Sequence, residues 1–93
     1  MFALPDRMTL VEVPALTLKL RDLMSRAQDG TFLVKAGGLQ HFDSSALAFL
    51  LEGRREGLRQ MRSLAIEDAP AKLVVLADLY GVRELLGLNA AKS

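Results

Sequence analysis

The 93-residue sequence has no cysteine, no tryptophan and a single histidine, His41. The lack of cysteine excludes disulfides, thiolate metal ligands and cysteine nucleophiles. One histidine with no second ligand group at a suitable spacing does not make a metal site, so we expect no bound metal. The pair Gly37-Gly38 is not followed by the lysine of a phosphate-binding loop, and we expect no nucleotide or other cofactor.

An excess of charge of one sign and a long apolar run are also lacking. The formal net charge is +1, which does not predict a nucleic-acid-binding protein. The apolar runs are shorter than the roughly 20 residues that span a bilayer. The first residues, MFALPDRM, lack the basic and apolar regions of a signal peptide. These observations predict a soluble, cytoplasmic protein with one domain over residues 1–93.

The spacing of apolar residues predicts strands that alternate with helices. We expect a hairpin of the first two strands across Pro5-Asp6, and helix ends at Asp29-Gly30 and at Gly81, where glycine supplies a left-handed conformation. The order predicts an α/β domain with an approximately four-stranded mixed sheet covered by helices. The expected strands are 2–4, 8–13, 31–36 and 63–66; the expected helices are 16–27, 43–61, 70–80 and a short turn at 82–86, before a frayed tail at 89–93.

The helix expected over 43–61 has an apolar face, a charged face and a stripe of small residues. The stripe consists of Ala46, Gly53 and Gly57, and two glycines inside a helix cost about 1 kcal/mol each relative to alanine. A close neighbour explains them, and it is either a helix of the same domain or a helix of a partner. The leucine cluster expected to contact the sheet is Leu47, Leu50, Leu51, Leu58 and Met61, and the solvated side chains are Glu52, Arg55, Glu56 and Arg59.

Phe49 lies beyond the small-residue stripe and away from the leucine cluster on this helix. An aromatic side chain at such a position is either half-covered by a loop or an exposed anchor for a partner. Both interpretations remain open from the spacing alone.

The run Asp43-Ser44-Ser45 precedes this helix. Aspartate is among the best N-cap residues, because its carboxylate accepts hydrogen bonds from first-turn N–H groups. The serines have no nucleophile-elbow motif around them, and His41 comes just before the cap, so we expect no catalytic residues. A phosphate added to a serine here would change the surface charge and leave the core intact.

The stretch AGGLQHFDSSALAFLLEGRREG resembles the core motif of STAS domains, in which a strand leads through a short loop to D-[ST]-[SGT]-[GA]-L at the start of a helix. Residues 43–47 match this motif position by position, with Ala46 where glycine is common. The expected order of elements is also similar to the STAS fold. Lys35 stands where many STAS proteins have an aspartate at the end of the central strand, so no role of that acid is carried over.

Two groups of small STAS proteins fit this resemblance. One is the cytoplasmic STAS subunit (MlaB-like) of Mla-type phospholipid ABC transporters, which the C-terminal AKLVVLADLYGVRELL resembles most. It implies a non-catalytic accessory subunit that binds and supports the transporter ATPase and reaches the inner membrane only through the complex. The other group is the anti-sigma factor antagonists, in which the serine matching Ser44 is phosphorylated by a partner kinase.

The resemblance implies a protein-binding site at the start of the second long helix and no contact with nucleic acid. This protein-binding surface is expected to self-associate when the partner is absent. Ser44 is the expected phosphorylation site if the chain is an antagonist. The expected partner-binding residues are Asp43, Ser44, Ser45, Ala46, Phe49 and Gly53.

Overall fold

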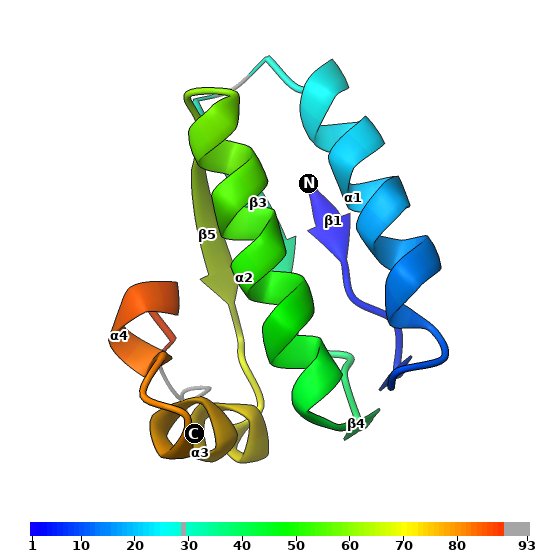
Figure 1. The fold of residues 1–93 in the computed structure, drawn as a ribbon, viewed down its shortest axis with the longest axis vertical. Helices are drawn as coiled ribbons and strands as arrows, with labels where there is room; N and C mark the ends of the chain where they lie inside the picture. The colour runs from blue at the N-terminus through cyan, green and yellow to red at the C-terminus, as the bar shows by residue number, and fades with distance from the viewer. Residues whose placement is uncertain (29, 89–93) are drawn as a thin grey trace.

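The computed structural model describes residues 1–28 and 30–88, so the expectations for Asp29 and for the tail at 89–93 lie outside the described residues. The described chain is an alternation of short strands and helices (Figure 1). The elements are β1 (Phe2–Ala3), β2 (Arg7–Met8), α1 (Val13–Arg26), β3 (Thr31–Lys35), β4 (His41–Phe42), α2 (Ser44–Arg59), β5 (Ser63–Glu67), α3 (Ala71–Leu79) and α4 (Arg83–Leu86).

The strands form two ladders, and their pairings are all parallel. The larger sheet has the order β1-β3-β5, with Phe2 opposite Val34 and Val34 opposite Ile66. The smaller one pairs β2 with β4, with Arg7 opposite His41. The predicted α/β class with crossover connections is confirmed. The sheet itself differs from the expected four-stranded mixed one, because each pair of hydrogen-bonded strands is separated in the sequence by at least one helix.

The predicted strand over residues 8–13 and its hairpin are wrong. Of the residues 8–13, only Met8 belongs to a strand, β2. The chain then turns and enters α1. The Glu12 carboxylate accepts hydrogen bonds from the backbone N–H of Thr9 at 2.8 Å and from its hydroxyl at 2.6 Å. These local bonds replace a strand ladder, and they leave Leu10 and Val11 73% and 82% exposed. The β-branched and apolar residues that predicted a strand here belong to a turn and to the start of α1.

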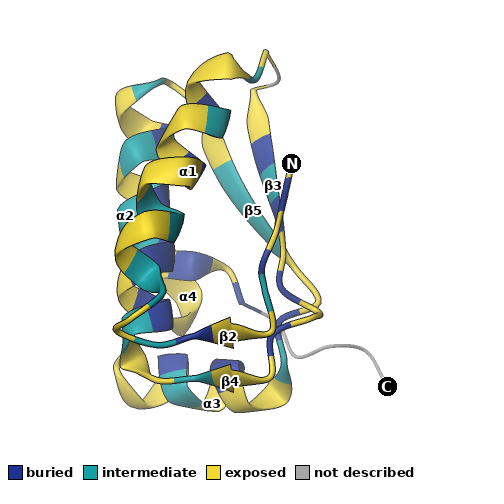
Figure 2. Cartoon of the chain, turned by 90° about the vertical axis from the view of Figure 1, so that its right-hand side faces the viewer, coloured by how far each residue is buried: buried dark blue, intermediate teal, exposed yellow. Residues whose placement is uncertain are grey.

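Helices α1 and α2 lie side by side on one face of the three-stranded sheet (Figure 1). Figure 2 shows buried residues on the sides of both helices that face β3 and β5. A Cβ atom on Gly53 would lie only 2.8 Å from Cδ2 of Leu20 in α1, and one on Gly57 would lie 3.0 Å from the carbonyl oxygen of Arg62. The small-residue stripe therefore packs within the domain, which confirms the first of the two interpretations.

Phe49 belongs to the hydrophobic core. Its side chain is only 1% exposed, and its ring lies 6.1 Å from the ring of Phe2 in β1. Neither expectation for Phe49 is correct, because α1 and the first strand cover a side of α2 that a single-helix projection treats as surface. Leu58 and Met61, expected to contact the sheet, are 60% and 92% exposed. They lie at and beyond the last turn of α2, past the part that covers the sheet.

The ends of α2 and α3 share one hydrogen-bond pattern. After α3, the N–H of Gly81 donates to Asp78 and that of Val82 to Ala77, and Gly81 has a φ of 71° as predicted. After α2, the N–H of Arg62 donates to Gly57, and the left-handed position is held by Met61 with a φ of 59°. Helix α1 ends differently, because Ala27 is extended.

Candidate functional site

The start of α2 is fixed by a side-chain cap. Asp43 is extended, with φ −126°, and its carboxylate accepts a hydrogen bond from the backbone N–H of Ser45 at 2.8 Å. This bond is the main cause of a pKa of Asp43 below its usual value, and the backbone N–H of Leu10 lowers the pKa further. The predicted cap is confirmed. The positive end of the helix dipole also stabilises the negative charge of the Asp43 carboxylate.

The approach of the chain to this cap is also fixed. The backbone N–H groups of Gln40 and His41 both donate to the carbonyl oxygen of Asp6 at 2.8 Å. His41 and Phe42 then pair with β2, so two segments far apart in the sequence hold the residues just before Asp43. These backbone hydrogen bonds therefore fix the position of the first turn of α2.

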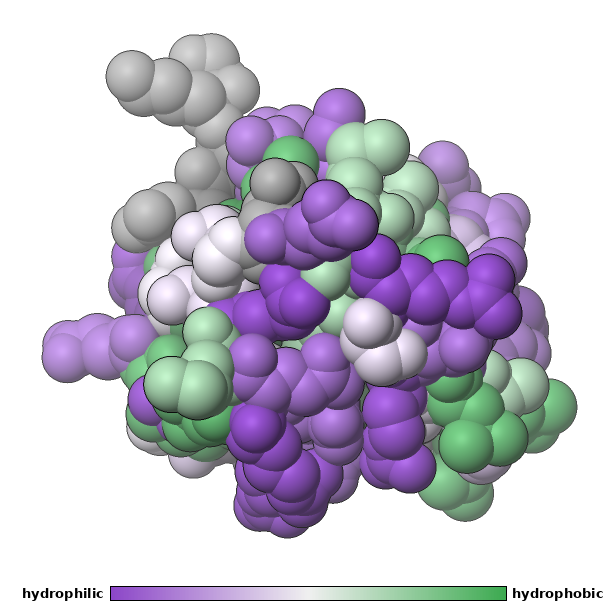
Figure 3. Space-filling view, turned by 90° about the horizontal axis from the view of Figure 1, so that it is seen from above, coloured by the Kyte–Doolittle hydropathy of each residue, from purple (hydrophilic) through white to green (hydrophobic). Residues whose placement is uncertain are grey.

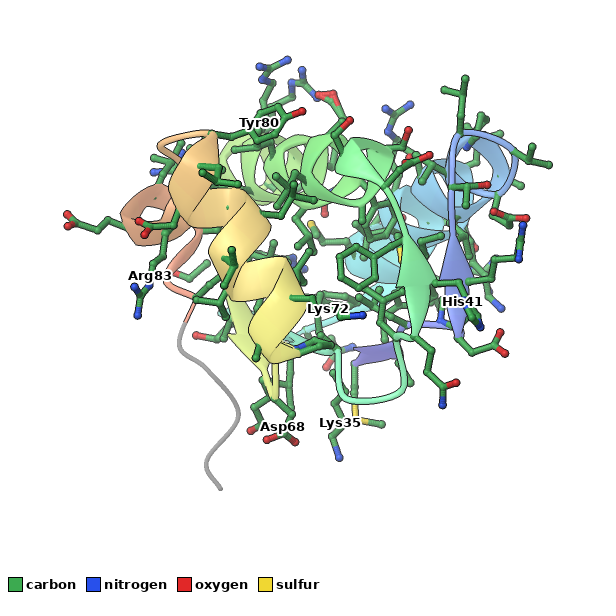
Figure 4. The ribbon with its side chains drawn as sticks, turned by 90° about the horizontal axis from the view of Figure 1, so that it is seen from below. Lys35, His41, Asp68, Lys72, Tyr80 and Arg83 are labelled. Carbon is green, nitrogen blue, oxygen red and sulfur yellow. The ribbon has the colours of Figure 1, made fainter. Side chains whose placement is uncertain are left out.

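Ser44, the first residue of α2, is exposed and borders an apolar hollow. The hollow has a volume of about 290 Å³ and lies between α2 and the end of α3. Tyr80 is 60% exposed and lies beside α2 (Figure 4). The side chains that line the hollow are Ser44, Leu47, Ala48, Leu51, Tyr80 and Val82.

A second hollow, of about 410 Å³, lies on the α1 side of the same helix. Val13 and Thr17 of α1 line it, together with Ala48, Leu51 and the beginning of the charged part of α2. Because Ala48 and Leu51 line both hollows, the surface is continuous across α2. We call the residues Ser44, Ala48, Leu51 and Tyr80 the docking face.

The C-terminal half of α2 has a different surface. Glu56 forms ion pairs with Arg59 at 2.8 Å and with Arg21 of α1 at 3.4 Å, and Glu52 pairs with Arg55 at 3.2 Å. The side-chain amide of Gln60 is the first cause, and Arg59 a further one, of a lowered pKa of Glu56. Seen from above, the centre of this end of the molecule is mainly hydrophilic (Figure 3).

The structure divides the expected partner-binding residues into two sets. Asp43 and Ser44 are exposed and Ser45 is half-buried, so these three are accessible at the cap. Ala46 and Phe49 are each 1% exposed, and Gly53 is buried against Leu20. Those three belong to the packing of α2 within the domain, which corrects their assignment to a partner.

Sequence reasoning did not single out Ala48 and Tyr80 as part of this surface, and it assigned Leu51 to the sheet. A signal was present, since Ala48 and Leu51 follow Ser44 at i+4 and i+7 on one helix face. No sequence spacing indicates Tyr80, because its position depends on how α3 packs beside α2.

Two observations on the described part of the chain concern the residues that catalysis or metal binding would use. Among the hydrogen bonds of residues 1–28 and 30–88, none joins His41 to Ser44 or Ser45. The same residues contain no group of three side chains from His, Cys, Asp and Glu that would hold a metal ion. None of the helices described has the length and apolar character needed to cross a membrane.

Comparison with known proteins gives one family match. A search of the curated proteins found no match. The model of a family described as "Mlab, STAS domain" matches residues 2–87, which include every strand and helix described above. The match also covers the Asp43 cap and the docking face. The chain belongs to this family of STAS domains.

Proposed function

We propose that the protein is a non-catalytic accessory subunit that binds and supports the ATPase subunit of a phospholipid-transporting ABC transporter. The observation that carries this proposal is the exposed Ser44 beside the apolar hollow at the capped start of α2. The membership in the STAS family and the resemblance of the C-terminal segment to the transporter subunit support it.

The docking face combines the features of a protein-binding surface. Its centre is apolar and concave, so a partner side chain inserted beside Leu47 and Leu51 buries apolar area on both proteins. Tyr80 contributes a large aromatic surface with a hydroxyl that remains able to form hydrogen bonds. Ser44 and Asp43 add polar groups at the edge, where they set the register of a partner.

The proposed role places the protein at the cytoplasmic side of the inner membrane through its complex. The ATPase subunit makes the membrane contact by way of its permease, and the present chain touches no lipid. Its contribution to transport is to hold the ATPase subunit in its assembled form, and this requires binding without any reaction.

A binding measurement with the purified ATPase subunit tests this proposal. Ala48→Arg places a charged side chain between the two hollows, and we expect it to weaken binding at least about tenfold, which corresponds to about 1.4 kcal/mol. Ser44→Arg is expected to act in the same direction. Arg59→Ala, at the charged end of the same helix and outside both hollows, is the matched control and is expected to bind as the wild type does.

The thermal unfolding midpoint separates this effect from misfolding, because Ser44 and Ala48 are both exposed and their substitution leaves the core intact. Unchanged binding of Ala48→Arg would contradict the assignment of the docking face.

The second candidate function is an anti-sigma factor antagonist switched by phosphorylation of Ser44. The exposure of the Ser44 hydroxyl at the start of α2 favours it, because a kinase needs a reachable hydroxyl. Affinity purification from native membranes distinguishes the two functions. Recovery of a serine kinase and no ATPase would overturn the transporter role and support the antagonist.

A further inference from the structure

A second concave region lies apart from the docking face, between the β2–β4 ladder and the start of α3. It has a volume of about 510 Å³. Its polar lining carries three basic side chains and no carboxylate: Arg7, Thr9, Gln40, His41 and Lys72. Phe42 and Leu76 form its apolar part.

The register of the small ladder brings two of the basic side chains together. Arg7 is the direct partner of His41 in a parallel pairing, so both side chains project from the same face of the ladder. Lys72 comes from the first turn of α3 and points toward this ladder (Figure 4). The three basic groups therefore reach one hollow from three separate elements.

Arg7 has an acidic partner, whereas His41 and Lys72 have none among the described residues. Glu12 lies 3.5 Å from Nε of Arg7, and its carboxylate also accepts both hydrogen bonds from Thr9. Asp43 is occupied by the backbone of its own helix. Within residues 1–28 and 30–88, neither His41 nor Lys72 takes part in an ion pair.

We propose that this hollow, lined by Arg7, Gln40, His41 and Lys72, binds the phosphate group of a small organic phosphate. A phosphate offers several acceptor oxygens to donors that approach from different directions, and arginine and lysine are its usual ligands. The hollow is larger than one phosphate ion, and Phe42 and Leu76 provide an apolar wall for the organic part. This site is independent of the partner proposed for the docking face.

Titration of the full chain, followed through its backbone amide signals by NMR, tests this inference. The probes are inorganic phosphate and glycerol 3-phosphate, each compared with chloride at the same ionic strength. We expect saturable shifts at Gln40, His41 and Lys72 with both phosphates, and saturation at a lower concentration with glycerol 3-phosphate. Equal affinity for the two would show that free phosphate alone is bound and would overturn the role of the apolar wall.

Two neutral variants with matched geometry locate the binding groups. Lys72→Gln is expected to weaken phosphate binding about tenfold, the loss typical of a hydrogen bond to a charged group. Lys35→Gln is the control, because Lys35 is exposed at the end of β3 and points away from the hollow (Figure 4). His41→Gln, which keeps a donor, serves as a second test if Lys72→Gln lowers the unfolding midpoint.

Three results would overturn the proposal. Shifts that match those with chloride would show only ionic strength. An equal loss in Lys35→Gln would show unspecific attraction to a basic surface. A stronger response to a short glutamate peptide than to either phosphate would assign the hollow to an acidic protein segment.

Discussion

The two halves of α2 have opposite surfaces on one continuous helix. The N-terminal half exposes Ser44 and Ala48 between apolar hollows. The C-terminal half carries the ion pairs of Glu52 and Glu56 with three arginines. Charged side chains that already have partners are costly to desolvate, whereas an apolar hollow gains free energy when it is covered. The difference explains why one half suits a partner and the other suits solvent.

Substitution of Phe49 has the largest expected effect on the free energy of unfolding. It also separates the residues that stabilise the fold from those proposed to bind a partner within the N-terminal half of α2. Its neighbour Ala48 is exposed, and Phe49 itself is 1% exposed against Phe2. We expect Phe49→Ala to lower the free energy of unfolding by about 3–5 kcal/mol through loss of packing and a cavity. Urea denaturation measures this change. A Phe49→Ala protein that kept its stability and lost only its partner would restore the anchor interpretation.

Gly53 gives a smaller effect in the C-terminal half. A valine there has no room, because even its Cβ would lie 2.8 Å from Cδ2 of Leu20, which is 2% exposed. We expect Gly53→Val to lower the free energy of unfolding by about 1–3 kcal/mol, the usual range for overpacking. The control is Gly30→Ala, where a Cβ meets no atom within 4 Å. If both variants were equally stable, α1 would move away from α2 at little cost.

The dependence of stability on pH gives the smallest expected effect and tests both ends of α2 together. The Ser45 N–H lowers the pKa of Asp43, and the Gln60 amide lowers that of Glu56. Each carboxylate therefore stabilises the folded chain fully above its unfolded pKa, about 3.9 for Asp and about 4.3 for Glu. This stabilisation is lost as the pH falls through the lower folded pKa.

We expect the free energy of unfolding to fall below about pH 4 and to fall less steeply in the double variant Asp43→Asn, Glu56→Gln. Asparagine still caps a helix, so the fold is retained at neutral pH. Urea denaturation between pH 3 and 7 measures the slope, and an identical slope in the double variant would exclude these two groups as its source.

The helices were predictable from the sequence because their apolar periodicity and end signals agree. Asp43 caps α2 and Gly81 ends α3 as expected. The end of α2 was harder to place, because Met61 holds a left-handed position that usually belongs to glycine. The segment from Met8 to Val13 has the β-branched and apolar composition of a strand, and this composition gives no sign of the local hydrogen bonds between Thr9 and Glu12.

The candidate site was predictable only in part. Asp43 and Ser44 follow from the cap and from the motif. Ala46, Phe49 and Gly53 were misplaced because the buried arc of α2 is set by two neighbours, the sheet and α1. Tyr80 enters the site through the packing of α3 beside α2, which no pattern within one helix encodes.

The parallel pairing also determines when the domain can form during synthesis. β1 cannot pair until Val34, the partner of Phe2, has been synthesised. β3 cannot complete its pairing with β5 until Glu67, the last paired residue of β5, has been synthesised. In residues 1–28 and 30–88 every strand pairing joins segments that are distant in sequence, so folding is expected to be slow for the size of the domain. On the ribosome, the part of α2 that contacts β5 stays uncovered until β5 has emerged. A chaperone that shields apolar segments therefore has its longest opportunity before that point.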